Sequence, residues 1–241
     1  MKKIITTIWL CCIIVMISCN NQNSQKKEIV DTTALEIGGF VLTGTLDSYL
    51  SDKVYLNKII ENEIYPVDST AIENNQFIFK GAVKYPERFA LTFENYSTAV
   101  ILIIENTDFQ MSLNTNQINE PVITGSALNN ELHEYELTSK RIFKKIEFLF
   151  PQFQKARLEN DATKLLEIGN EMKNIEAEFV DYSYNFIKNN RNSFVSAMIL
   201  HDQLKTAKSD TLRIEQTYYM LAEEVKKSSD AQIIASALKL H

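Results

Sequence analysis

The chain has 241 residues, of which 45% are hydrophobic and 23% charged, and a length prior of roughly 150 residues per domain predicts one or two globular domains. Its 25 Lys and Arg against 31 Asp and Glu give a formal net charge of -6, and no run of four basic residues occurs. Because nucleic-acid binding needs a basic surface, this charge balance argues against a nucleic-acid partner.

The first residues have the pattern of an export signal. Lys2 and Lys3 precede a largely apolar run of 14 residues, Ile4 to Ile17. A helix that spans a bilayer core needs about 20 apolar residues, so this run favours a cleaved signal over a permanent transmembrane helix. We therefore predict a signal peptide over residues 1–18.

The end of this segment, VMISCNN, resembles a bacterial lipobox. In a lipobox, cleavage after a small residue leaves an N-terminal cysteine that carries a diacylglycerol on sulfur. Cleavage is thus expected between Ser18 and Cys19, with the lipid attached to Cys19, although Met16 stands where lipoboxes usually have leucine. Each buried CH₂ of such a lipid contributes about 0.8 kcal/mol to membrane binding. The alternative is a plain secretory peptide with an incidental cysteine.

Processing at Cys19 would leave the mature chain without a free thiol, since Cys11 and Cys12 depart with the signal. Disulfides, thiol catalysis and cysteine-based metal sites would then be excluded. Losing Lys2 and Lys3 would also move the formal charge from -6 to -8. Residues 19–35 are polar without a repeating apolar pattern, which predicts a tether between the lipid and the folded body.

Residues 36–126 predict an antiparallel β-sandwich of seven or eight short strands. Asn74-Asn75 tolerates positive φ and indicates a hairpin turn, and the continuous apolar run Val100 to Ile104 indicates a strand buried on both faces. Apolar residues alternate with period two at Phe77 and Phe79, at Phe89, Leu91 and Phe93, and at Phe109, Met111 and Leu113.

Residues 127–241 change to helical spacing, so the predicted fold class is α+β, a sandwich followed by an all-α hairpin or bundle. Two long helices joined near Glu159 to Ala162 are expected to pair antiparallel, with Pro151 interrupting or kinking the first. Their apolar stripes are Leu128, Leu132, Tyr135, Ile142, Ile146 and Leu149 in the first helix and Leu165, Ile168, Met172, Ile175, Phe179, Tyr182 and Phe186 in the second.

Three shorter helices are predicted after this hairpin. Asn192-Ser193 is typical of a cap for a helix that holds Phe194, Met198 and Ile199. Another helix holds Ile214, Tyr218, Leu221 and Val225, and a last one runs from about Ser229 to Leu240.

The three histidines indicate no metal or catalytic site. His133 lies in LHEYE, which begins like a zincin helix but has Leu137 where the second His ligand must stand. His201 ends an apolar helix face, which favours a core or capping residue, and His241 is the last residue. No phosphate-binding glycine motif and no G-x-S-x-G elbow occurs.

Two acidic stretches are interpreted as structural. Asp68-Ser69 is expected to form a turn in which the side chains bond their own backbone. Glu223-Glu224 is expected on a helix with Lys226 and Lys227, as a solvated face. We predict no catalytic residue, no cofactor and no metal, and an enzyme is unsupported.

Several stretches together resemble the N-terminal domain of unknown function of Bacteroidetes lipoproteins, where it precedes a thioredoxin-like domain of the thiol:disulfide interchange family. The stretches are VYL at 54–56, VDSTAIENNQFIFKGAVKYPERFAL at 67–91, ILIIEN at 101–106, VITGSALNNELHEY at 122–135, FIKNNRNSFVSAMIL at 186–200 and YYMLAEEVKKSSDAQIIASAL at 218–238. The resemblance implies the fold and a cell-envelope location. Its redox activity does not carry over, because no C-x-x-C follows Cys19.

The sequence therefore leaves three functions open. The first is a lipid-anchored, periplasm-facing binding module for an envelope protein or for a separate thioredoxin-like protein. The second is the truncated remnant of a thioredoxin-domain oxidoreductase, since the chain stops where the relatives would begin that domain. The third, weaker, is a carbohydrate-binding or hydrolytic envelope protein.

Overall fold

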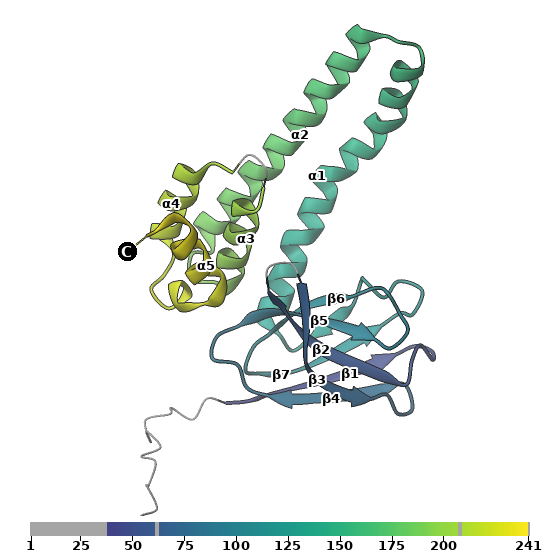
Figure 1. Ribbon diagram of the computed structural model, residues 1–241, viewed down its shortest axis with the longest axis vertical. Coiled ribbons are helices and arrows are strands. Elements are labelled where there is room, and N and C mark those ends of the chain that lie inside the picture. The colour runs from purple at the N-terminus through teal and green to yellow at the C-terminus, as the bar shows by residue number, and fades with distance from the viewer. Residues whose placement is uncertain (1–37, 61–62, 207–208, 241) are drawn as a thin grey trace, which may run out of the picture. The chain divides into compact units, whose positions relative to one another are not determined.

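The computed structural model describes residues 38–60, 63–206 and 209–240, which belong to one compact unit, Glu36–His241 (Figure 1). The predicted signal peptide, the Ser18/Cys19 cleavage and lipid site, the body of the tether and His241 lie outside the described residues. Among the described helices, none has the length and apolar character needed to cross a membrane.

Eight strands form two four-stranded sheets that pack face to face, and helices follow, so the predicted α+β class is confirmed. All neighbouring strands are antiparallel except β1 and β7, which are parallel. The first sheet has the order β4 (Gln76–Gly81), β1 (Phe40–Leu46), β7 (Asp108–Leu113) and β8 (Val122–Thr124). The second has the order β3 (Glu63–Ala71), β2 (Lys53–Ile60), β5 (Glu87–Phe93) and β6 (Val100–Ile104).

The core of the sandwich consists of the residues with period-two spacing. The alternating aromatic and aliphatic side chains of β4, β5 and β7 are all buried, as predicted. Strand β6 differs in part: Ile103 is fully buried on the face that packs against helices, but Ile101 on that same face is 45% exposed. The helices cover only one end of β6, so the strand is not buried on both faces along its whole length.

The predicted turn at Asn74-Asn75 is confirmed, since the two residues have φ values of 51° and 60° between β3 and β4. Asp68-Ser69 was expected in a turn, and this prediction is wrong because both residues lie in β3. The local bond is present nonetheless: Ser69 N donates to Asp68 Oδ1 at 2.7 Å. Strand β3 is an edge strand exposed on both faces, so it lacks the alternation that reveals strands in a sequence.

Two long helices, α1 (Ala127–Leu158) and α2 (Ala162–Asn189), form the expected antiparallel hairpin (Figure 1). Asp161 caps α2 by accepting a bond from Lys164 N. Pro151 does not interrupt α1, and the seven-residue spacing of buried Leu149 and Ala156 continues across it. The proline is exposed, so its ring occupies the solvent side of the helix, where a lost backbone bond is tolerated.

The chain ends in three short helices, α3 (Phe194–Leu204), α4 (Thr211–Met220) and α5 (Ser229–Leu238), with a 3₁₀ turn η1 (Val225–Lys227) before the last. Ser193 caps α3, as predicted. The α4 helix ends earlier than expected, because Leu221 adopts extended backbone and Val225 lies in η1. Glu223 and Glu224 therefore lie in the turn before η1, and the prediction that they lie on a helix is wrong. Their ion pairs with Lys226 and Lys227 lie at the surface, as expected.

Candidate functional site

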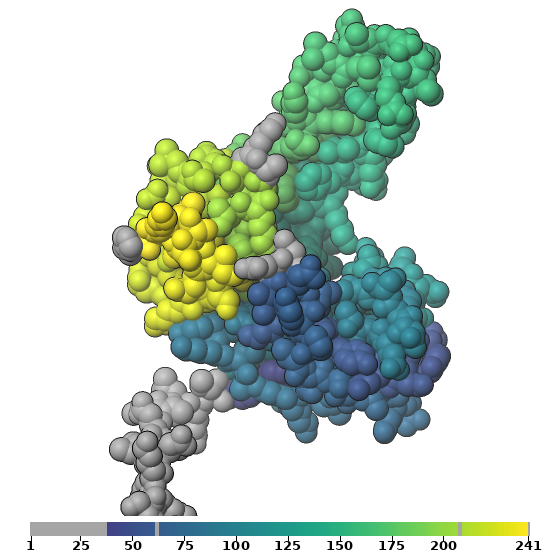
Figure 2. Space-filling view, in the orientation of Figure 1, coloured from purple at the N-terminus to yellow at the C-terminus, as the bar shows by residue number. Residues whose placement is uncertain are grey.

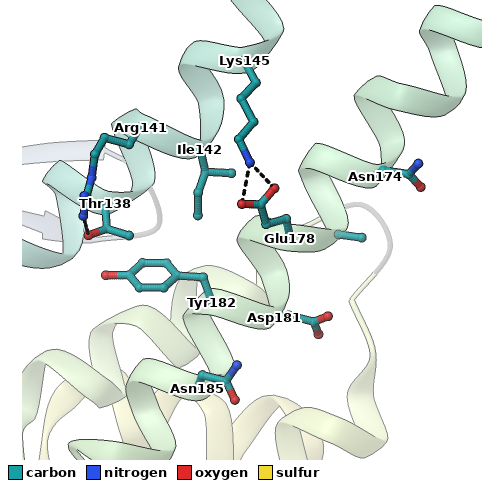
Figure 3. Close-up of a pocket in the computed structure, with 10 residues that line it drawn as sticks. Thr138, Arg141, Ile142, Lys145, Asn174, Glu178, Asp181, Tyr182 and Asn185 are labelled. Atoms are coloured by element: carbon teal, nitrogen blue, oxygen red, sulfur yellow. Dashed lines mark hydrogen bonds and ion pairs between the residues drawn. The ribbon is translucent and has the colours of Figure 1, made fainter.

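An open groove of about 800 Å³ runs along one side of the α1–α2 hairpin (Figure 3). It is larger than the hollow beside β1, β7 and Gly125. Helix α1 contributes Thr138, Arg141, Ile142 and Lys145, and α2 contributes Asn174, Ala177, Glu178, Asp181, Tyr182 and Asn185. We call this surface the hairpin groove.

The two long helices are held at the groove by ion pairs and by stacked rings. Lys145 Nζ donates to the two carboxylate oxygens of Glu178 at 2.7 and 2.6 Å, directly across the hairpin (Figure 3). Tyr182 stacks on Tyr135 with ring centroids 5.3 Å apart. The Lys145–Glu178 pair also sets the register of the antiparallel hairpin. A residue of α1 therefore lies level with the α2 residue for which the two residue numbers sum to about 323.

The outer half of the hairpin has a core of its own. Its buried residues are Ile142, Leu149, Ile168 and Ile175, with Ile146, Phe153, Met172, Phe179 and Tyr182 packed around them. All of these side chains come from α1 and α2. The outer end of the groove therefore rests on side chains of α1 and α2 alone, and Figure 2 shows this end of the hairpin extending beyond the other elements. At its inner end, Tyr182 also packs against the core shared with α3 to α5, and Asp181 is paired with Arg213 of α4 at 2.9 Å.

The hairpin groove is suited to binding and not to covalent chemistry. Its walls offer guanidinium, ammonium, carboxylate, amide and phenol groups, but no histidine and no thiol. Small-molecule sites are usually enclosed and mostly apolar, whereas this groove is open and its lining is about half polar. In the described residues, no three His, Cys, Asp or Glu side chains are grouped to hold a metal ion. Such walls match a segment of another macromolecule that offers hydrogen-bonding groups of both kinds.

The histidines singled out in the sequence lie away from this groove. His133 is exposed on α1. His201 is buried in α3, as expected for a core residue, and its Nδ1 lies 2.6 Å from Asp230 Oδ1 of α5. The sequence did not predict this pairing, because 29 residues separate the two.

Arg88 of β5 completes a cluster that joins the sandwich to the helices. Its guanidinium donates to both carboxylate oxygens of Asp202 at 2.8 Å and to Met198 O at 3.2 Å, and it lies 3.4 Å from Asp230. Burial alone would raise the pKa of Asp230, but the bond to His201 and the charge of Arg88 hold that pKa below its usual value. Because the polar groups of the cluster bind one another, we assign it a structural role.

Strand edges were a second candidate for binding, by addition of a peptide strand. The open edge of β6 is covered at Ile103, because the Asn129 side chain of α1 bonds both backbone groups of that residue. The edge of β3 contains Pro66 and a register shift opposite Leu56 and Asn57, and both features disfavour pairing with another strand. Two of the four sheet edges are thus protected, and the hairpin groove remains the stronger candidate.

Sequence reasoning located the hairpin but missed the groove. The apolar stripe marks the positions that face inward, and the groove is formed by their polar neighbours on one flank. Arg141 and Lys145 flank Ile142, and Asn174 and Glu178 flank Ile175. A signal was available in this spacing, but polar flanking positions look the same in any solvated hairpin.

Residues 40–132 match a protein family described as a domain of unknown function (DUF4369). The match covers the sandwich and the beginning of α1. It confirms the part of the resemblance that concerns a domain of unknown function. No curated protein and no solved structure matches the chain.

Proposed function

We propose that this chain is a non-catalytic binding module of the cell envelope, anchored by lipid at Cys19, and that its hairpin groove receives a segment of an envelope protein. The family resemblance implies a thioredoxin-like protein as the class of partner. The observation that carries the proposal is the groove itself: an open surface, about half polar, on a hairpin whose outer end has its own core.

The distribution of charges in the groove supports recognition of a protein segment. Lys145 of α1 is paired with Glu178 of α2, whereas Arg141 of α1 bonds only the hydroxyl of Thr138 among the described residues (Figure 3). A segment lying over the groove can place an acidic group against Arg141 and can bond the amide groups of Asn174 and Asn185. Such electrostatic complementarity fixes orientation and selects among partners more than it adds affinity.

The lipid anchor is supported by the lipobox-like end of the apolar segment and by the polar stretch that follows it. Intact mass spectrometry of the purified chain tests it. We expect a mass that begins at Cys19 with a diacylglycerol, and we expect Cys19→Ser to leave the membrane fraction. An unmodified, reducible thiol at Cys19 would contradict the anchor.

The binding role is tested by affinity capture from detergent-solubilised membranes. The wild-type chain is compared with Arg141→Glu/Lys145→Glu, which reverses one wall of the groove, and with Lys80→Glu/Lys84→Glu, an equal change of charge on the sandwich. We expect a discrete envelope protein with the wild type and the control and its loss with the groove variant. Equal capture by all three chains would count against the groove.

A further inference from the structure

The side of the hairpin opposite the groove carries a second surface. In α1, buried Ile142, Leu149 and Ala156 recur every seven residues. The residues that directly follow them in sequence are Phe143, Phe150 and Arg157, which lie on one flank of this buried stripe. Arg141 and Lys145 lie on the other flank, in the groove. We call this opposite surface the rear face and define it by Phe143, Glu147, Phe150 and Arg157 of α1 and Leu166, Gly169, Lys173 and Glu176 of α2.

The rear face exposes large apolar side chains. Phe150 is 54% exposed, Leu166 is 66% exposed and Phe143 is 38% exposed. By the register that Lys145–Glu178 sets, Leu166 lies level with Arg157, so the three apolar residues follow one another at intervals of about 10 Å along the face. Apolar side chains aligned on one helix face are typical of a surface that another helix covers.

Gly169 is a second, independent sign of close contact on this face. Glycine inside a helix is less favourable than alanine, so it usually has a packing reason. Here a Cβ at Gly169 would meet nothing within 4 Å, and its φ is not positive. Nothing in the described chain therefore requires glycine, whereas a helix packed across the rear face would use the space that the missing side chain leaves.

The charges of the rear face favour a second copy of this chain as the partner that covers it. Glu147 and Glu176 balance Arg157 and Lys173, and in the described part of the chain none of the four forms an ion pair. A face without net charge gives no attraction to anionic lipid head groups. It is instead suited to a copy of itself, because every charge has its opposite on the same face.

We propose that the rear faces of two copies of this chain pack together, in opposite directions, to form a four-helix dimer. The inner end of α2 is already taken, since Tyr184 and Ile187 pack with α3 to α5. A second copy therefore overlaps only the outer half, with its tip directed towards the body of the first. The two-fold axis that relates the copies crosses α1 at the level of residue 152. Glu147 of each copy then lies beside Arg157 of the other, and the two Phe150 side chains lie near each other.

The dimer does not depend on the lipid anchor or on an envelope partner, so its failure would leave the proposed function standing. The test is the molar mass of the purified full chain in a non-ionic detergent, by light scattering, up to about 100 µM. We expect a dimer, which Phe150→Glu converts to monomer with an unchanged circular dichroism spectrum. A wild type that stays monomeric throughout, or a dimer that survives Phe150→Glu, would overturn the proposal.

A charge exchange tests the orientation. Glu147→Arg and Arg157→Glu each place like charges together and should weaken the dimer about tenfold, while the double variant should return to near wild-type affinity. Lys144→Glu, on the same helix but off the rear face, is the matched control and should leave the dimer intact. Failure of the double variant to recover would contradict the reversed two-fold arrangement.

Gly169→Leu distinguishes an effect on dimer affinity from an effect on the stability of the monomer. A leucine is a better helix former than glycine, so the variant monomer should unfold at a higher temperature. The same side chain fills the space that the second copy uses, so dimer affinity should fall. If affinity is unchanged or rises, the rear face is not the contact. Flotation of a monomeric Cys19→Ser chain with anionic vesicles, abolished by adding Phe150→Glu, would likewise overturn the dimer in favour of a lipid surface.

Discussion

The side chain of Asn129 binds the backbone of Ile103 as a neighbouring strand would. Ile103 N donates to Asn129 Oδ1 at 2.8 Å, and Asn129 Nδ2 donates to Ile103 O at 2.7 Å. Asn129 belongs to the first turn of α1, whose cap, Ser126, donates to Glu105 at the end of β6. The position of the whole hairpin is thus set at the edge of the sandwich.

Replacing Asn129 should destabilise the chain strongly. Asn129→Ala leaves two backbone groups of the fully buried Ile103 without partners, which costs about 2–4 kcal/mol in the free energy of unfolding. Urea denaturation followed by circular dichroism measures the change. Asn130→Ala, at the exposed neighbouring position, should stay within about 0.5 kcal/mol of wild type. Equal effects of the two variants would contradict a special role for Asn129.

Arg88 should be the main polar link between the sandwich and α3. Arg88→Leu removes the bidentate pair with Asp202 and should cost about 2 kcal/mol, a figure reduced because Asp202 is partly exposed. Arg88→Lys should recover only part of the loss, since a lysine cannot form the paired bonds. A double-mutant cycle with Asp202→Asn measures the coupling, and Lys84→Ala on an exposed position is the control. Zero coupling would show that the pair does not stabilise the junction.

Gly44 of β1 lies directly against the ring of Phe77 in the sandwich core. A Cβ at Gly44 would clash with the ring of Phe77 in β4. Gly44→Ala should therefore destabilise the chain by about 1–3 kcal/mol through overpacking. In the double variant with Phe77→Leu, the alanine should cost much less than it does alone. An alanine that costs the same in both backgrounds would contradict this steric account.

Stability should rise as the pH falls from neutral. Burial raises the pKa of Glu131, although the bond from Ser193 lowers it in part. A raised pKa means that the folded chain binds the proton more tightly, so stability increases as pH falls through that pKa and levels off near the unfolded value of about 4.3. Asp230 acts in the opposite sense, since its lowered pKa means that stability is lost only below about pH 4.

Urea denaturation at a series of pH values checks this dependence. Glu131→Gln should remove part of the rise between neutral pH and pH 5 and leave the loss at low pH in place. A flat profile in the wild type between these values, or an unchanged rise in the variant, would contradict the assignment to Glu131.

The regular parts of the fold were predictable because local patterns report them. Period-two spacing marked the buried faces of β4, β5 and β7, and spacings of three and four marked the hairpin. Ser193 was recognised as a cap because its hydroxyl and the following apolar run are close in sequence. Each of these features depends on residues within a few positions of one another.

The features that sequence reasoning missed depend on distant residues. The parallel pairing of β1 with β7 joins Leu42 to Phe109, which no turn signal connects. Arg88 meets Asp202 across 114 positions, and the covering of Ile103 by Asn129 needs the fold to be known. The continuation of α1 past Pro151 also depends on context, because burial of Leu149 and Ala156 on either side of the proline compensates for one lost backbone bond.

The central claim is that the hairpin groove binds a protein in the cell envelope, and site-specific photocrosslinking in living cells tests it most directly. A photoreactive phenylalanine analogue is placed at Asn174 in the groove, and at Asn130 as an exposed control outside it. We predict one discrete protein adduct from Asn174, absent from Asn130. No adduct at Asn174, or the same adduct from both positions, would contradict the account.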